Sequence, residues 1–130
     1  RFKLSDATES DMLLGLAITD TTAIDGVTDG VFFKKDDGDT NLDFVVEKDS
    51  TETATAAVGT VADDTFITAT FFIDPDRSKV YYSINNAAPV GVVNTNLPDN
   101  EELTVTIAVQ AGAAAAKSLT VDYVSAIVER

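Results

Sequence analysis

Short apolar runs alternate with polar turn signals along the whole chain, at a spacing typical of β-strands joined by tight turns. Residues 1–5 alternate apolar and polar side chains, and residues 51–61 alternate Thr with Ala and Val, which is a pattern typical of β-strands. Residues 12–19 (MLLGLAIT) are almost continuously apolar, which is typical of a strand covered on both faces. The pattern predicts an all-β domain with its main strands at residues 12–19, 65–73, 80–84, 103–109 and 119–128.

Turn residues indicate how consecutive strands connect. An Asp-Gly pair within residues 36–39 separates two β-type runs, residues 31–35 and 42–47, and therefore predicts a hairpin. Residues 74–78 (DPDRS) predict a second tight turn. The pair at residues 85–86 is Asn-Asn, which tolerates the positive φ angles of a hairpin turn. This regular spacing predicts two antiparallel sheets packed face to face.

Composition limits the classes of function. The chain has 130 residues, 45% of them apolar, which suits a single domain with one core spanning residues 1–130. The net charge of −13 and the pI near 4.1 disfavour phosphate backbones and anionic lipids, so neither nucleic acid nor a membrane is expected as a partner. His and Cys are absent, which removes the commonest general base, the commonest zinc ligand and every thiolate site. The opening at Arg1, without a start Met, suggests that the parent chain is longer at its N-terminus.

Two segments resemble the concanavalin A-like and laminin G-like domains. Residues 65–93 (TFITATFFIDPDRSKVYYSINNAAPVGVV) resemble a hairpin of that superfamily, and residues 118–130 (SLTVDYVSAIVER) resemble its last strand. The resemblance implies a two-sheet antiparallel jelly-roll sandwich of the concanavalin A-like kind. Its motifs are structural, so they indicate the fold and not an activity.

A narrower resemblance is to virion proteins of tailed bacteriophages. It covers residues 2–8, residues 30–47 (GVFFKKDDGDTNLDFVVE) and residues 114–123. The resemblance implies a non-enzymatic structural protein on the outer surface of the virion. Its role would be capsid decoration, or cement, with the major capsid protein or copies of itself as partners. The alternative is a carbohydrate-binding, lectin-like module, for example on a tail fibre, with a glycan as its partner.

Glu47, Asp49 and Glu52 reproduce the E-x-D-x-x-E spacing of laminarinase-type glucanases, which are the third alternative. In those enzymes a strand projects the carboxylates into a cleft, and retaining chemistry needs the two carboxyl groups about 5 Å apart. Here the residues between the carboxylates are polar, and the chain has no Trp to stack a sugar ring. The sequence therefore favours the absence of a catalytic site.

Asp36, Asp37 and Asp39 belong to the densest group of oxygen ligands in the sequence, together with Asn41 and Asp43. Calcium prefers carboxylate and carbonyl oxygens, so these residues form a candidate calcium site. The spacing differs from that of an EF-hand, and an ordinary hairpin turn is the alternative reading. No other cofactor is expected.

Four residues are candidates for an interface. Adjacent aromatic residues in a strand point to opposite faces, so one ring of each Phe-Phe or Tyr-Tyr pair must leave the core, and we assign Phe72 and Tyr81 to that role. Ala114 and Ala115 lie in a run of four alanines that is too short to nucleate a helix. Such small side chains would let another backbone approach closely.

Overall fold

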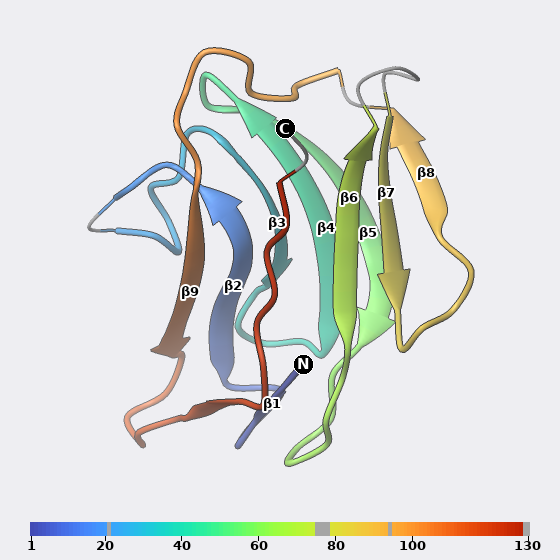
Figure 1. Cartoon of the computed structure of the whole chain (residues 1–130). Coiled ribbons are helices and arrows are strands. Elements are labelled where there is room, and N and C mark those ends of the chain that lie inside the picture. The colour runs from blue at the N-terminus through green and yellow to red at the C-terminus, as the bar shows by residue number, and fades with distance from the viewer. Residues whose placement is uncertain (21, 75–78, 94, 129–130) are drawn as a thin grey trace.

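The computed structural model describes residues 1–20, 22–74, 79–93 and 95–128. Those residues contain ten strands and no helix, and every strand pair is antiparallel (Figure 1). The all-β prediction is therefore confirmed. The strands are β1 (Phe2–Leu4), β2 (Ser10–Ala17), β3 (Gly30–Lys35), β4 (Asn41–Lys48), β5 (Thr51–Thr60), β6 (Ala69–Asp74), β7 (Lys79–Ile84), β8 (Val90–Val93), β9 (Thr104–Ala111) and β10 (Leu119–Val121).

A five-stranded sheet has the order β5-β4-β3-β2-β9. Strands β2 to β5 follow one another in the chain, whereas β9 comes from the distant C-terminal part and pairs with β2 along its whole length, from Ser10 opposite Ala111 to Ala17 opposite Thr104. Since side chains alternate between the two faces of a sheet, this register decides which residues share a face. The core face carries Phe44, Phe33 and Leu14 in one row across neighbouring strands.

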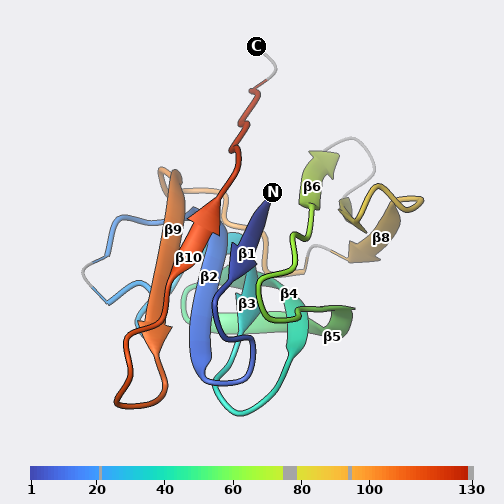
Figure 2. The same cartoon turned by 90° about the horizontal axis from the view of Figure 1, so that it is seen from below.

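The opposite layer contains the three-stranded sheet β6-β7-β8 and the pair β1-β10. Phe2 connects these two parts. It pairs with Val121 of β10 on one side, and on the other side it exchanges backbone hydrogen bonds of 3.0 and 2.8 Å with Ile67, just before β6. Strand β1 thus lies between β10 and the segment that leads into β6. Figure 2, which views the molecule from below, shows the five-stranded sheet on one side and these strands on the other.

The main core lies between the two layers. Phe44 of the five-stranded sheet contacts Phe71 and Tyr82 of the three-stranded sheet, and Phe33 contacts Phe71, with ring centroids 5.3 to 6.1 Å apart in tilted arrangements. Tilted aromatic pairs at these separations are favourable beyond the area they bury. Apolar residues from both layers thus form one hydrophobic core.

A smaller apolar cluster covers the other face of the five-stranded sheet. Leu13, Phe32 and Val45 are each at most 2% exposed there, and Val27 from the loop before β3 packs on them together with Ala108 of β9. Both faces of β2 and β3 are therefore covered, which explains why the sequence is almost continuously apolar in β2. The expectation of a strand covered on both faces is confirmed for this part of the chain.

The observed turns agree with the turn chemistry of the sequence. Gly38 has a φ of 91° in the β3–β4 connection, where a left-handed conformation costs glycine little. Asn85 and Asn86 have φ angles of 51° and 60° after β7, as expected for a hairpin turn. The turn predicted at residues 74–78 falls largely on residues 75–78, which lie outside the described residues.

Two predicted strands are shorter than expected. The strand predicted at residues 65–73 begins only at Ala69, since before it Ile67 alone makes a bridge, to Phe2. The strand predicted at residues 119–128 ends at Val121. Residues 123–128 have β propensity, but a strand also needs a neighbour to complete its hydrogen bonds, and β1 supplies one only as far as Arg1.

Candidate functional site

The acidic hairpin turn between β3 and β4 is held against the N-terminal loop. The backbone N–H of Asp37 donates to Oδ1 of Asp11 at 2.7 Å, and the N–H of Gly38 donates to the carbonyl of Thr8 at 2.8 Å. Asp39 accepts from the backbone N–H of Asn41 at 2.8 Å. The carboxylates of Asp11 and Asp39 therefore accept backbone N–H groups of the turn and stabilise its conformation, as Asp commonly does in loops.

Lys35 supplies a positive charge beside this turn. Its side chain is on the core face of β3 and is 1% exposed, and its ammonium donates to the carbonyl oxygens of Ser10 and Asp36. Burial lowers the pKa of Lys35, while the charges of Asp39, Asp11 and other nearby carboxylates act in the opposite direction. The ammonium of Lys35 thus supplies, next to these carboxylates, the positive charge that a bound cation would supply.

No three acidic side chains in the described part of the chain are grouped so that they could hold a metal ion. The structure therefore does not bring Asp36, Asp37 and Asp39 together as a ligand set. Calcium binding at these residues stays a hypothesis from the sequence, and the melting experiment given below tests it against charge compensation by Lys35. Sequence reasoning missed Lys35, although it alternates with Val31 and Phe33 on the core face.

A second charged group ties the connector before β10 to the N-terminal loop. The ammonium of Lys117 donates to Asp6 at 2.6 Å and to Glu9 at 2.9 Å. The hydrogen bond from Lys117 lowers the pKa of Asp6 to about 2, and the same contacts raise the pKa of Lys117. Ala114 and Ala115 lie in this connector, and both are exposed.

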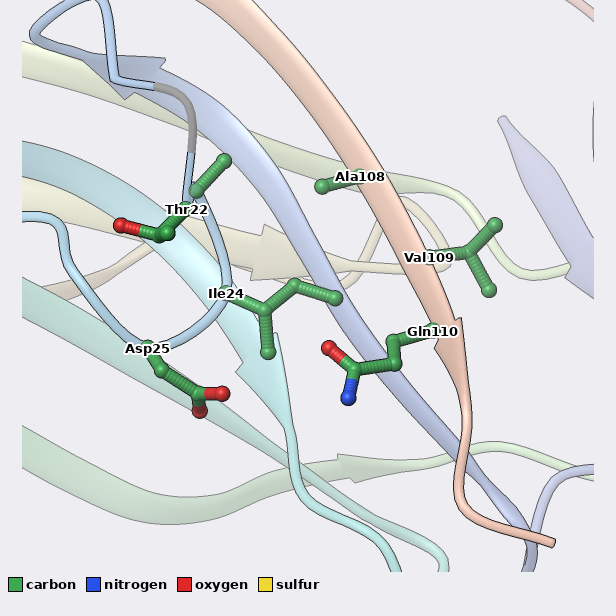
Figure 3. Close-up of a pocket in the computed structure, with 7 residues that line it drawn as sticks. Thr22, Ile24, Asp25, Ala108, Val109 and Gln110 are labelled. Atoms are coloured by element: carbon green, nitrogen blue, oxygen red, sulfur yellow. The ribbon is translucent and has the colours of Figure 1, made fainter.

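A cavity of about 400 Å³ lies beside the loop before β3, on the outer face of the five-stranded sheet. Figure 3 shows Thr22, Ile24 and Asp25 of that loop facing strand β9. From β9, Ala108 and Gln110 point towards the loop, whereas Val109 points to the other side, as strand alternation requires. Polar and apolar groups are mixed here, and the lining residues present no convergent set of charged groups.

A second cavity of about 190 Å³ lies on the same face, and Glu47, Glu52 and Lys34 are among the residues that line it. Glu47 and Glu52 are directly opposite each other on β4 and β5, and the ammonium of Lys34 is 3.9 Å from Oε2 of Glu52. Burial raises the pKa of Glu47, and the charge of Glu52 raises it further. Glu47 is half-buried, whereas Glu52 is exposed.

The E-x-D-x-x-E motif is divided by a turn. Asp49 has a φ of 50° between β4 and β5, and its N–H donates to Oδ1 of the buried Asp29 at 3.1 Å. Glu47 and Glu52 therefore project from two different strands. This differs from the glucanase arrangement, in which one strand carries the carboxylates.

The outer face of the three-stranded sheet carries a stacked aromatic pair. Phe72 and Tyr81 are cross-strand neighbours with ring centroids 4.8 Å apart and an interplanar angle of 11°. Phe72 is 48% exposed, whereas Phe71 and Tyr82 pack on the core. The expectation that one ring of each pair leaves the core is confirmed, and we call Phe72 and Tyr81 the aromatic pair.

A glycine lies beneath one ring of the aromatic pair. Gly91 of β8 is opposite Tyr81, and a Cβ atom at Gly91 would lie 2.8 Å from Cε1 of Tyr81. The absence of a side chain at Gly91 therefore lets the Tyr81 ring lie close to the sheet. The result is a stacked aromatic pair, with Phe72 exposed, on a strongly acidic protein.

Comparisons with protein families, curated proteins and solved structures found no match to this chain. The described residues form no helix that is long and apolar enough to cross a membrane. The assignment of a function must therefore start from the surface itself, and the aromatic pair is the candidate functional site.

Proposed function

We propose that this chain is a non-enzymatic structural protein, a capsid decoration or cement subunit on the outer surface of a phage particle. The fold we propose is a concanavalin A-like jelly roll, a finer description of the observed antiparallel layers. Resemblance of residues 2–8, 30–47 and 114–123 to phage virion proteins supports the biological role. The single structural observation that supports adhesion is the stacked aromatic pair, in which Phe72 is exposed and Tyr81 is half-buried.

The proposed mechanism is adhesion through a small apolar contact. Exposed aromatic residues are enriched at protein interfaces, because they bury a large area at a low cost in conformational entropy. Phe72 and Tyr81 are already stacked, so little ordering is required when a partner covers them. The remaining acidic surface would stay hydrated and keep unattached subunits soluble.

Co-sedimentation with purified phage heads tests the proposal. Phe72→Ser should weaken binding to heads at least about tenfold, as expected for the loss of a buried aromatic anchor. Thr70→Ala is the matched control, since Thr70 is an exposed residue of the same strand and the same face. Binding held by apolar contact should persist or tighten as salt rises, because screening reduces repulsion between acidic subunits.

One result would contradict the decoration role, and a second would contradict the assignment of its contact surface to the aromatic pair. The first is a chain that never co-sediments with heads at any salt concentration and remains a monomer by light scattering. The second is binding to heads that Phe72→Ser and Thr70→Ala leave equally strong. Failure to bind heads would favour the carbohydrate-binding module described next. Binding that Phe72→Ser leaves unchanged would place the contact on another surface.

The second candidate is a carbohydrate-binding module. The ring of Phe72, which is 48% exposed and is held in place by stacking on Tyr81, is the surface on which a sugar ring would stack. A glycan array with the unmodified chain and with Phe72→Ser separates the two candidates. Glycan binding that is lost in Phe72→Ser, without attachment to heads, would favour this second function.

A further inference from the structure

The five-stranded sheet exposes part of its core face at one edge. Val105, Ile107 and Val109 of β9 are 47%, 42% and 37% exposed, although they are in register with Leu16, Leu14 and Met12 of β2, which share the core face. Of the residues of β9 that point outward, Thr106 and Ala108 are less exposed than these apolar residues, whereas Thr104 and Gln110 near the strand ends are exposed. In the middle of β9 the burial pattern is thus the reverse of that expected for an edge strand over a completed core.

The opposite layer is incomplete over the same edge. After β10, residues 122–128 move away from the five-stranded sheet, as Figure 2 shows, and Ile127 and Val128 are 91% and 85% exposed. Strand β6 has β7 on one side, and the described residues supply no strand along its other side beyond the bridge at Ile67. Among the described residues, two backbone edges therefore lack a neighbouring strand: β6 beyond the bridge at Ile67, and residues 124–128, which follow the last backbone contacts of Asp122 and Tyr123 with Arg1.

Strand β1 fixes the register of a strand that would fill this position. Phe2 and Ile67 exchange both backbone hydrogen bonds, so by antiparallel alternation the backbone groups of Ala69, Phe71 and Ile73 point to the same side as those of Ile67. On the opposite edge the nitrogen of Arg1 donates to the carbonyl of Tyr123 at 2.9 Å. A strand that extended β1 beyond Arg1 would therefore continue the backbone hydrogen bonds on both sides, to β6 and to the residues after β10.

We propose that this position is a strand-acceptor site, and that its occupant is an extended segment joined to the amino end of β1. The polarity of β1 makes the segment antiparallel to both β6 and residues 122–128. One end of the site is closed by β1 itself, so a strand passing through from a separate folded partner would collide with Phe2. A segment joined at Arg1 meets no such obstacle. This inference does not depend on the proposed function.

The acceptor site also specifies the chemistry of its occupant. Phe2 and Leu4 are 3% and 0% exposed and share the core face of β1. Apolar side chains are therefore required at the first, third and fifth positions ahead of Arg1, with polar residues between them. Such a strand would cover the exposed edge of the core and bring residues 122–128 back onto the layer. An unpaired edge with an apolar face is otherwise open to non-specific pairing.

A pair of designed extensions tests the proposal. A segment as long as β6, six residues, is fused ahead of Arg1 with Val and Thr alternating. In one version Val occupies the first, third and fifth positions ahead of Arg1, and in the other version Val and Thr are exchanged. The first version should raise the melting temperature by roughly 5 °C and slow chymotrypsin cleavage after Tyr123 about tenfold. The exchanged version, with the same composition, should do neither.

Three outcomes would overturn the inference. The first is an unchanged melting temperature and cleavage rate in both versions. The second is an equal rise in melting temperature and an equal slowing of cleavage in both versions, because the site requires one register. The third concerns the occupant. If the first-version segment, added as a free peptide, protects Tyr123 while the fused segment does not, the site accepts a partner's strand instead.

Discussion

Glu47 and Glu52 lie directly opposite each other across the two-residue turn of Asp49 and Ser50. Like charges that are directly opposed in a sheet destabilise it. Here the half-buried position of Glu47 adds a desolvation cost, and burial followed by the charge of Glu52 raises the pKa of Glu47. The nearby Lys34 compensates only in part, because its ammonium also lies 3.5 Å from Asp36.

The first prediction is that Glu47→Gln stabilises the protein at neutral pH. The folded state holds the Glu47 proton more tightly than the unfolded chain, so the wild type loses stability as pH rises from the ordinary glutamate pKa through the raised value. The advantage of the variant should therefore disappear in acid, below the ordinary pKa. Urea unfolding at a series of pH values measures this, with Glu101→Gln in an exposed loop as the control.

The same Glu47→Gln protein tests the proposed absence of catalysis. Neither the wild type nor the variant should release reducing sugar from β-glucans. Hydrolysis by the wild type that Glu47→Gln abolishes would restore the glucanase alternative, and with it a catalytic role for this carboxylate pair.

The second prediction concerns Asp6, whose pKa is lowered to about 2 by the hydrogen bond from Lys117. A carboxylate with a lowered pKa contributes stability that is complete above its unfolded value, near 3.8, and that is lost as pH falls through about 2. Asp6→Asn should destabilise the protein at pH 7 and match the wild type near pH 2. Lys117→Met should show the same pH dependence if the two residues act as a pair. Independent effects in the double variant would contradict this pairing.

The third prediction is that Lys35→Met destabilises the fold by about 2 kcal/mol, because it leaves the carbonyls of Ser10 and Asp36 without their buried donor. Lys34→Met is the matched control. Lys34 is the preceding residue, but its side chain lies on the outer face and is 31% exposed. Chemical unfolding of both variants gives the comparison. Equal, small effects would show that the buried ammonium has no structural role.

The fourth prediction is that millimolar calcium leaves the melting temperature of the wild type unchanged relative to magnesium at equal ionic strength. Lys35 already places a positive charge beside Asp36, Asp37 and Asp39. A ligand that binds only the folded state must raise the melting temperature. A rise specific to calcium and reversed by EDTA would therefore establish these carboxylates as a calcium site.

Local signals in the sequence predicted the hairpins well. The Asp37-Gly38 pair and the Asn85-Asn86 pair adopt positive φ angles at Gly38, Asn85 and Asn86, as their side chains permit. Alternation alone also predicted that one ring of each adjacent aromatic pair points outward. These features depend on residues close together in the chain, so one sequence is enough to predict them.

Contacts between distant segments decided the rest. The sequence by itself determined the all-β class, the acidic surface and the departure of one ring of each aromatic pair from the core, because alternation and charge are local properties. Only the tertiary structure decided that β10 stops at Val121, that Glu47 faces Glu52 at the edge of a cavity, and that Lys35 is buried. Each of these depends on which strand lies alongside, as when β9 pairs with β2 across most of the chain. Strand propensity does not specify the partner, since backbone hydrogen bonds are the same for every sequence.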